Sequence, residues 1–172
     1  MISIAITGPE CSGKTSLAKE LSTFFGSALV VEYSRIFLGK INRPYKEHDL
    51  VDIAQGQQDL FAMQVLLNPS IIVNDTDMSV IQIWSEAKYH RISPALQSIL
   101  DSAKQHHYYL LCYPDLPWED DPLRESKNGR LALFDLYFKH LEANNLPYSV
   151  IRGMGKQRSE LAISIIQEKF GL

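Results

Sequence analysis

Apolar residues follow two alternating patterns along the chain, namely short runs and longer stretches in which they recur every three or four residues. The short runs are typical of strands and the longer stretches of helices. The predicted strands are residues 1–7, 28–32, 70–74, 108–112 and 148–151, and the predicted helices are 14–25, 49–67, 80–88, 94–105, 129–144 and 157–170. Because strands and helices alternate, we expect an α/β fold with a five-stranded parallel, doubly wound sheet and helices on both faces.

Turn residues separate these elements without marking a domain boundary. Asn68-Pro69 ends the long helix, and Ser93 fits the N-cap position before Pro94. Residues 113–128 combine three prolines with many charged side chains, which is typical of a loop. The 172 residues contain no linker or repeat, so we expect one domain, residues 1–172.

Composition and charge limit the kinds of molecule and compartment that we expect for this protein. The net charge of −3 argues against broad binding to nucleic acid, and no apolar run has the length needed to cross a membrane. The basic, apolar opening of a signal peptide is absent. Cys11 and Cys112 are too few for a disulfide framework, so we expect a cytoplasmic protein. A homo-oligomer is compatible with all of these properties.

Residues 8–15, Gly-Pro-Glu-Cys-Ser-Gly-Lys-Thr, match the phosphate-binding loop pattern G-x-x-x-x-G-K-[ST]. The glycines allow backbone amides to face an anion, Lys14 reaches the β and γ phosphates, and the Thr15 hydroxyl suits Mg²⁺. The strand before and the helix after would place phosphate at a helix N-terminus. We therefore predict a P-loop NTPase fold with ATP and Mg²⁺ as cofactors. The expected nucleotide-binding residues of the loop are Gly8, Pro9, Glu10, Cys11, Ser12, Gly13, Lys14, Thr15 and Ser16, with Cys11 as a small filler residue.

Carboxylates follow two of the predicted strands, at the sheet edge where ligands gather in such folds. Asp75, after a continuously apolar strand, is the expected metal partner of Thr15. Glu32 is a candidate general base for an attacking hydroxyl, and it can also pair with Arg35. Asp77 either contacts the substrate or caps the following helix.

Three arginines are candidates for contacts with the nucleotide. Arg124 and Arg130 lie in and just after the loop that follows the fourth strand, where arginines neutralise charge on a transferred phosphoryl group and help to exclude water. Arg158 follows the fifth strand and fits either the nucleotide or the surface. Ordinary solvated arginines remain the alternative for all three, and Lys127 is assigned to the surface.

Aromatic residues provide candidates for stacking on a flat heterocycle. They are Tyr33, Tyr45, Trp84, Tyr89 and Trp118. We favour Tyr33 and Trp118, which lie beside strand ends, because aromatic residues in a fold of this size usually belong to the core. The histidines lack metal-ligand spacing, so we expect no zinc site.

Five segments together carry a more specific signal than the phosphate loop alone. They are G-P-E-C-S-G-K-T at 8–15, V-V-E-Y-S-R at 30–35, H-D-L-V-D-I-A-Q-G-Q at 48–57, I-V-N-D-T-D at 72–77 and P-W-E-D-D-P-L-R at 117–124. In this order and spacing they resemble the ribosylnicotinamide kinase domain of NadR-type proteins, a branch of the P-loop kinases. The resemblance implies that ATP and nicotinamide riboside are converted to ADP and nicotinamide mononucleotide.

The resemblance also implies roles for individual residues. The positions that match family motifs are Lys14, Thr15, Glu32, Arg35, Asp75, Asp121 and Arg124. We expect Lys14, Glu32, Asp75 and Arg124 to be catalytic, and we expect the nucleoside-like substrate to contact Glu32, Tyr33, Arg35, Asp77, Trp118 and Asp121. Pro122 departs from the glycine expected there and would stiffen the loop. The best-known members also carry an adenylyltransferase domain upstream, to which this resemblance does not extend.

Three alternatives compete with a ribosylnicotinamide kinase. The first is a kinase of another nucleoside or small alcohol. The second, a GTPase switch, would need the guanine-binding tetrapeptide N-K-x-D, which the sequence lacks. The third is a P-loop ATPase module that works with a partner protein, and it would need a sensor or ring-interface arginine.

Overall fold

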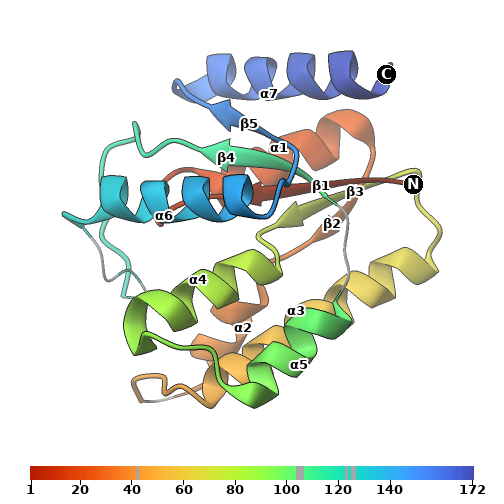
Figure 1. Ribbon diagram of the computed structural model, residues 1–172. Coiled ribbons are helices and arrows are strands. Elements are labelled where there is room, and N and C mark those ends of the chain that lie inside the picture. Colours follow the sequence, from red (N-terminus) through yellow and green to blue (C-terminus); the bar gives the residue numbers. More distant parts are fainter. Residues whose placement is uncertain (42, 104–106, 123, 125–126) are drawn as a thin grey trace.

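The computed structural model describes residues 1–41, 43–103, 107–122, 124 and 127–172. Within these residues, five strands form a sheet of order β2-β3-β1-β4-β5, and every neighbouring pair is parallel (Figure 1). The strands are β1 Ile2–Thr7, β2 Ala28–Val30, β3 Ile71–Asp75, β4 Tyr108–Cys112 and β5 Tyr148–Ile151. The predicted parallel sheet of an α/β fold is therefore confirmed.

Helices cover both faces of this sheet, as predicted. They are α1 Lys14–Phe25, α2 Tyr33–Leu38, α3 Asp49–Leu66, α4 Met78–Tyr89, α5 Pro94–Ser102, α6 Arg130–Ala143 and α7 Gly155–Phe170. Successive strand residues point to opposite faces. Ile4 and Ile6 of β1 belong to the core beneath α1 and α7, whereas Ala5 belongs to the core beneath α4 and α6.

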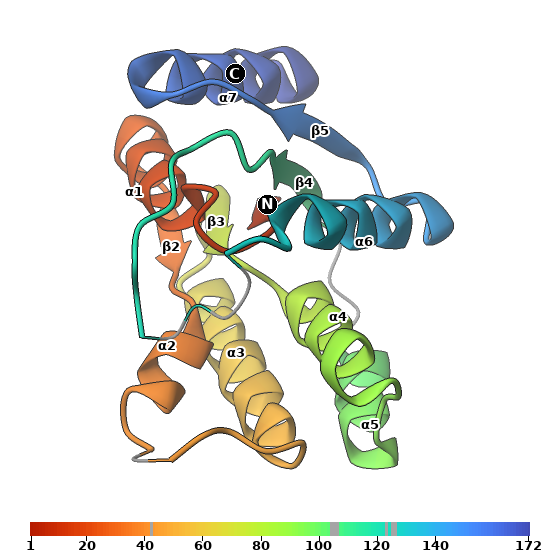
Figure 2. The ribbon, with the colours of Figure 1, turned by 90° about the vertical axis from the view of Figure 1, so that its left-hand side faces the viewer.

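A further cluster of helices extends from the β2 side of the molecule. Helices α3, α4 and α5 lie together there, with α2 against α3 (Figure 2). Leu50 and Ile53 of α3, Ile81 of α4 and Leu96 of α5 form its buried apolar centre. Helix α4 therefore contributes to this cluster and to the core of the sheet, which fixes its position beside the carboxyl ends of the strands.

One element was missed by the sequence analysis. The second strand was predicted to reach Glu32, but β2 ends at Val30, and Glu32 is the N-cap residue of the six-residue helix α2. The Glu32 carboxylate accepts hydrogen bonds from Ser34 and Arg35, and the Tyr33 amide donates to Gln57 of α3. These local contacts replace strand pairing, and a helix this short gives no clear apolar period.

The remaining boundaries agree with the prediction within two residues, apart from the helix predicted at 94–105. Its last residues, 104–106, lie outside the described part of the chain, and α5 ends at Ser102. The Ser93 hydroxyl accepts a hydrogen bond from the Leu96 amide, which confirms its N-cap role. Asp77 occupies the N-cap position of α4, but its side chain does not cap the helix; it accepts hydrogen bonds from Ser79 and Tyr109 instead. Among the described residues, no helix is both long enough and apolar enough to span a bilayer.

The phosphate loop is pressed against the end of β4. Gly8 has φ 130°, and a Cβ atom built there would lie 2.7 Å from the backbone oxygen of Cys112. A side chain at residue 8 would meet both a disfavoured backbone conformation and a backbone atom that has little room to move. Gly26, which ends α1 at φ 57°, has open space around the same position.

We expect Gly8→Ala to lower the free energy of unfolding by about 3 kcal/mol, because strain and steric overlap add at this position. The matched variant Gly26→Ala should cost about 1 kcal/mol, since it incurs the left-handed conformation alone. Urea denaturation of both variants measures the difference. Equal losses would show that the contact with β4 does not restrict residue 8.

Candidate active site

The phosphate loop joins β1 to α1 and is curled around the Lys14 side chain. The Lys14 ammonium donates to the carbonyl oxygens of Gly8, at 3.0 Å, and Pro9, at 2.9 Å. Gly13, at φ 77°, is the N-cap residue of α1, and no side chain caps this helix end. The first amides of α1 are therefore left to an anionic ligand, which the positive end of the helix dipole also favours.

Asp75 ends β3 beside this loop and is almost fully buried. Burial raises the pKa of its carboxyl, and the nearby Glu32 charge adds to the rise, while a hydrogen bond with Thr15 and the Lys14 charge oppose it. Its Oδ1 atom lacks a hydrogen-bond partner among the described residues. A buried, unpartnered carboxylate oxygen next to a threonine hydroxyl is a donor set that fits Mg²⁺.

Glu32 and Arg35 connect this centre to the loop after β4. The Glu32 side chain is 13% exposed, and its two oxygens accept from Ser34, at 2.7 Å, and Arg35 Nε, at 3.2 Å. The expected pairing of Glu32 with Arg35 is thus present. Arg35 also donates to Asp121 Oδ2 at 3.0 Å, so α2 is linked to that loop. These contacts hold a carboxylate at the mouth of the phosphate loop.

The loop that follows β4 passes over the phosphate loop and reaches α2 before it returns to α6 (Figure 2). Arg124 donates to Glu119 O and, at 3.3 Å, to Cys11 Sγ. The Cys11 thiol also donates to Pro117 O and accepts from the Glu119 amide. Cys11 is therefore more than a filler residue, because its sulfur joins the two loops.

Arg130 and Arg158, which were also predicted as site residues, donate hydrogen bonds to backbone carbonyl oxygens around the phosphate loop. Arg130 donates to the carbonyl oxygens of Cys11, at 3.2 Å, and Leu116, at 2.8 Å. Arg158 is almost fully buried and donates to Ser12 O at 2.6 Å and to Asp115 Oδ1 at 2.8 Å. The surface alternative for Arg158 is wrong. Lys127, by contrast, is 63% exposed and lies on the surface, as expected.

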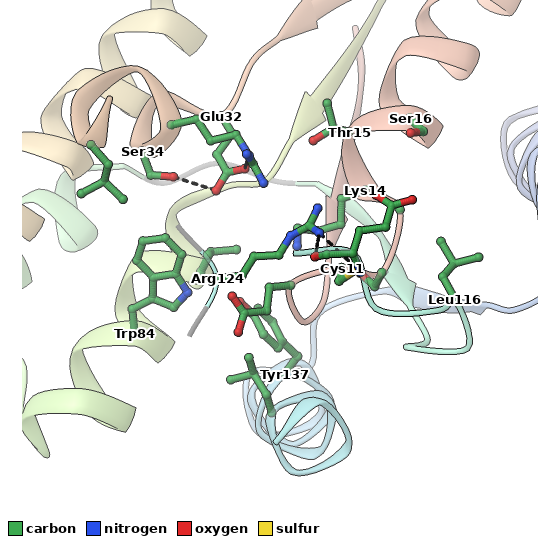
Figure 3. A pocket seen from close by; sticks show the side chains of 18 of the residues that line it. Cys11, Lys14, Thr15, Ser16, Glu32, Ser34, Trp84, Leu116, Arg124 and Tyr137 are labelled. Carbon is green, nitrogen blue, oxygen red and sulfur yellow. Dashed lines mark hydrogen bonds and ion pairs between the residues drawn. The ribbon is translucent and has the colours of Figure 1, made fainter. Parts of the chain in front are cut away.

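A cavity of about 710 Å³ extends from the phosphate loop to α4 and α6 (Figure 3). Of the predicted site residues, it is lined by Glu10, Cys11, Ser12, Gly13, Lys14, Thr15, Ser16, Glu32, Arg35 and Arg124. A smaller adjoining cavity of about 300 Å³ shares Thr15, Glu32 and Arg35 with it and includes Asp75. The structure therefore brings the predicted catalytic side chains to one place.

Several predicted residues lie near this cavity without lining it. The described lining of the cavity does not include Gly8, Pro9, Tyr33, Asp77, Trp118, Asp121, Arg130 or Arg158. Tyr33 packs over Gly56 of α3, where a Cβ atom would lie 2.1 Å from its ring. The guanidinium carbons of Arg124 and Arg130 each lie 5.8 Å from the centroid of the Trp118 ring, whose indole nitrogen donates to Asp120.

The aromatic side chains that do line the cavity are Tyr45, Trp84 and Tyr137. The rings of Tyr45 and Trp84 are 6.2 Å apart and tilted by 31°. Burial raises the pKa of Tyr137, nearby acidic groups add to the rise, and a hydrogen bond with Trp84 opposes it. The sequence analysis listed Tyr45 and Trp84 as stacking candidates but did not favour them, because neither lies beside a strand end. A helical signal was present, since Val80, Trp84 and Lys88 recur every four residues and share one face of α4.

Comparison with known proteins agrees with this geometry. Residues 3–158 match the sequence model of a family described as AAA domain. The trifunctional NAD biosynthesis/regulator proteins NadR of Salmonella typhimurium and Escherichia coli are 26% and 27% identical to this chain over 153 residues. The matched part is 84% of this chain, which spans only 37% of the length of these relatives.

Two solved NadR structures share the fold. One, in complex with NR, is 20% identical to this chain with a TM-score of 0.83. The match covers 99% of this chain and 52% of the chain of that structure. Another, in complex with NAD and AMP-PNP, is 18% identical with a TM-score of 0.77. That match covers 99% of this chain and 50% of the chain of the NadR structure. The predicted P-loop fold and the resemblance to NadR-type proteins are thereby confirmed.

We expect Asp75→Asn to stabilise the ligand-free protein at pH 7. Because the folded-state pKa of Asp75 is raised above its unfolded-state value, the charged carboxylate destabilises the folded state at neutral pH. The gain in unfolding free energy should grow as the pH rises from the unfolded-state pKa, and it should vanish below about pH 4, where the carboxyl is protonated in both states.

Urea denaturation at pH 7 and at acid pH measures this effect. The exposed residue Asp135 offers a matched control, and Asp135→Asn should leave the unfolding free energy nearly unchanged at both pH values. A loss of stability in Asp75→Asn at pH 7 would contradict the interpretation, because it would show that partners of the carboxylate outweigh its burial.

Proposed function

We infer the function of this chain from its site geometry and from its family, since the chain belongs to the AAA-domain family that matches residues 3–158. We propose that it is an ATP-dependent kinase that phosphorylates the 5′-hydroxyl of a ribonucleoside, with nicotinamide riboside as the acceptor. One observation carries the proposal: a single cavity is lined by the phosphate loop, by the Glu32 carboxylate and by aromatic side chains.

The donor end of the cavity suits a nucleoside triphosphate. Lys14, the uncapped N-terminus of α1 and Arg124 surround the position of the transferred phosphoryl group. The Nε atom of Arg124 is buried and makes no hydrogen bond among the described residues; it lies 4.0 Å from Asp121 Oδ2 in an ion pair, and it can donate to a phosphate oxygen. A NadR protein has been solved with the ATP analogue AMP-PNP, in agreement with this assignment.

Thr15 and Asp75 are the residues that would hold Mg²⁺. When bound, the ion would neutralise charge on the phosphates and orient them. Glu32 is positioned to accept the proton of the acceptor hydroxyl, and its hydrogen bonds with Ser34 and Arg35 fix its orientation. Described residues of the loop after β4, Arg124 among them, line the cavity, where they would help to keep water from competing with the acceptor.

The acceptor end supports a nucleoside with a flat base. The cavity that the phosphate loop lines is also lined by the aromatic side chains of Tyr45, Trp84 and Tyr137 and by Leu133. The structural relative in complex with NR supports nicotinamide riboside in particular. Another nucleoside or a small alcohol is the second candidate, because the same wall would accept any planar ring.

An ATPase module that acts with a protein partner makes a different prediction. It needs a water site but no enclosed organic acceptor site, whereas the aromatic wall adds a large apolar surface next to Glu32. Two of the arginines that the sequence analysis singled out, Arg130 at the start of α6 and Arg158 of α7, are engaged within the chain. Arg158 contacts Ser12 and Asp115, and Arg130 contacts Cys11 and Leu116.

Lys14→Ala should lower ADP release in the presence of nicotinamide riboside at least about 100-fold, because the ammonium meets the phosphoryl group in the transition state. A coupled assay with nicotinamide riboside, uridine and thymidine measures this rate and identifies the acceptor. Lys156→Ala removes an exposed lysine and should leave the rate unchanged. Substantial activity of a folded Lys14→Ala variant, or ADP release that is independent of any acceptor, would contradict the kinase proposal.

Glu32→Gln should lower kcat about 100-fold while the Kd of ATP stays within about a factor of two, because the carboxylate acts on the acceptor hydroxyl. Glu119→Gln is the matched control, since it removes another carboxylate that lines the cavity. Isothermal titration with ATP separates binding from chemistry. If the affinity for ATP falls instead, Glu32 belongs to the metal site and the general base is a different group.

A further inference from the structure

Tyr137 carries a hydroxyl group that the proposed reaction does not use. Its side chain comes from α6, is only 2% exposed, and lines the cavity together with Glu32 and Trp84. These three side chains surround one space, which they enter from α6, from the N-cap of α2 and from α4 (Figure 3). A buried polar group in the wall of a cavity needs a hydrogen-bond partner, either in the chain or in the ligand.

This hydroxyl is a hydrogen-bond donor that has no acceptor in the part of the chain that the structure describes. Its hydrogen-bond partner there is the indole of Trp84, and an indole N–H can only donate. The Tyr137 oxygen therefore accepts, and its own proton is left for a ligand. Burial raises the pKa of Tyr137, and the charges of Glu32 and Asp77 add to the rise, so the hydroxyl keeps this proton at neutral pH.

The surroundings of the hydroxyl correspond to the sugar of a bound nucleoside. Among single charges, Glu32 acts most strongly on Tyr137, which indicates that the two groups are close to each other. The proposed function assigns Glu32 to the 5′-hydroxyl of the acceptor and Trp84 to its base. Tyr137 interacts with both, and the sugar is the part of a nucleoside that joins the 5′-hydroxyl to the base. The 2′- and 3′-hydroxyl oxygens of a ribose are acceptors for a phenolic proton.

We propose that Tyr137 is a specificity-determining residue that donates a hydrogen bond to a secondary hydroxyl of the acceptor's sugar. The preferred acceptors are then ribonucleosides, and nucleosides that lack this hydroxyl are poorer substrates. The inference rests on the proposed function, since it concerns the same acceptor, but it makes a separate statement about the sugar and none about the base.

The test measures kcat/KM in the ADP-release assay for nicotinamide riboside and uridine, and for the 2′-deoxy and 3′-deoxy analogues of each. For a ribonucleoside that is phosphorylated, one of its two analogues should lower kcat/KM of the wild-type chain about tenfold, mainly through KM. Tyr137→Phe keeps the ring and removes the hydroxyl, so it should lower kcat/KM for the ribonucleoside about tenfold. The same analogue should then cause little further loss, because it removes the other partner of a hydrogen bond that is already missing.

A matched variant separates this role from the loss of any buried phenol. Tyr108 is also buried, and its hydroxyl is hydrogen-bonded to Ser149 at 2.7 Å, outside the described lining of the cavity. Tyr108→Phe should therefore discriminate against the deoxy analogue as strongly as the wild-type chain does. Isothermal titration with ATP should give the same Kd for Tyr137→Phe as for the wild-type chain, which shows that the variant is folded.

The outcomes distinguish the inference from the proposed function. If the wild-type chain uses both deoxy analogues as well as the ribonucleoside, or if Tyr137→Phe discriminates against them as the wild-type chain does, the inference is wrong and the kinase proposal stands. If uridine is recognised through Tyr137 and nicotinamide riboside is not phosphorylated, the inference holds and nicotinamide riboside is the wrong acceptor. If none of these nucleosides is phosphorylated, both statements are wrong.

Discussion

The buried guanidinium of Arg158 is the interaction on which the geometry of the site depends. It binds the Ser12 carbonyl in the phosphate loop, the Tyr113 carbonyl at the end of β4, the Gly153 carbonyl after β5 and the carboxylate of Asp115. Leaving one of these buried carbonyls unpaired costs free energy, so a single cation fixes three chain segments relative to one another. The phosphate loop is consequently shaped from the β4 side, where Gly8 also touches Cys112.

The opposite side of the site depends on carboxylates. Burial raises the pKa of Asp75, while Thr15 and Lys14 oppose that rise, and the Glu32 carboxylate is held by Ser34 and Arg35. The Asp75 carboxylate is thus placed where burial disfavours its charged form. An arrangement that costs stability in this way is typical of active sites, where strain and unpaired charge are retained because ligands use them.

The sequence predicted those parts of the molecule that local patterns determine. The phosphate loop, the sheet, the position of Asp75 and the Glu32–Arg35 pair all follow from a motif or from an apolar period read within a short segment. Tyr45 and Trp84 were stacking candidates that the sequence did not favour, because Tyr45 lies on a connection held by the ion pairs of Arg43 and Glu47, which join residues across that connection and to Arg91. Arg158 was misjudged because three of its four acceptors, in Ser12, Tyr113 and Asp115, lie at least 43 residues away in the sequence.

The loop after β4 touches both halves of the cavity. It is bonded to Cys11 in the phosphate loop through Pro117, Glu119 and Arg124, and to Arg35 on α2 through Asp121. Because this loop contacts both the phosphate loop and α2, a ligand that displaces it on one side of the cavity also changes its contacts on the other side. If the proposed nucleotide and acceptor both contact this loop, thermodynamic linkage requires that each change the affinity for the other by the same factor. Any coupling between the proposed nucleotide and acceptor would then act through the contacts of this loop and not through the sheet that carries the site.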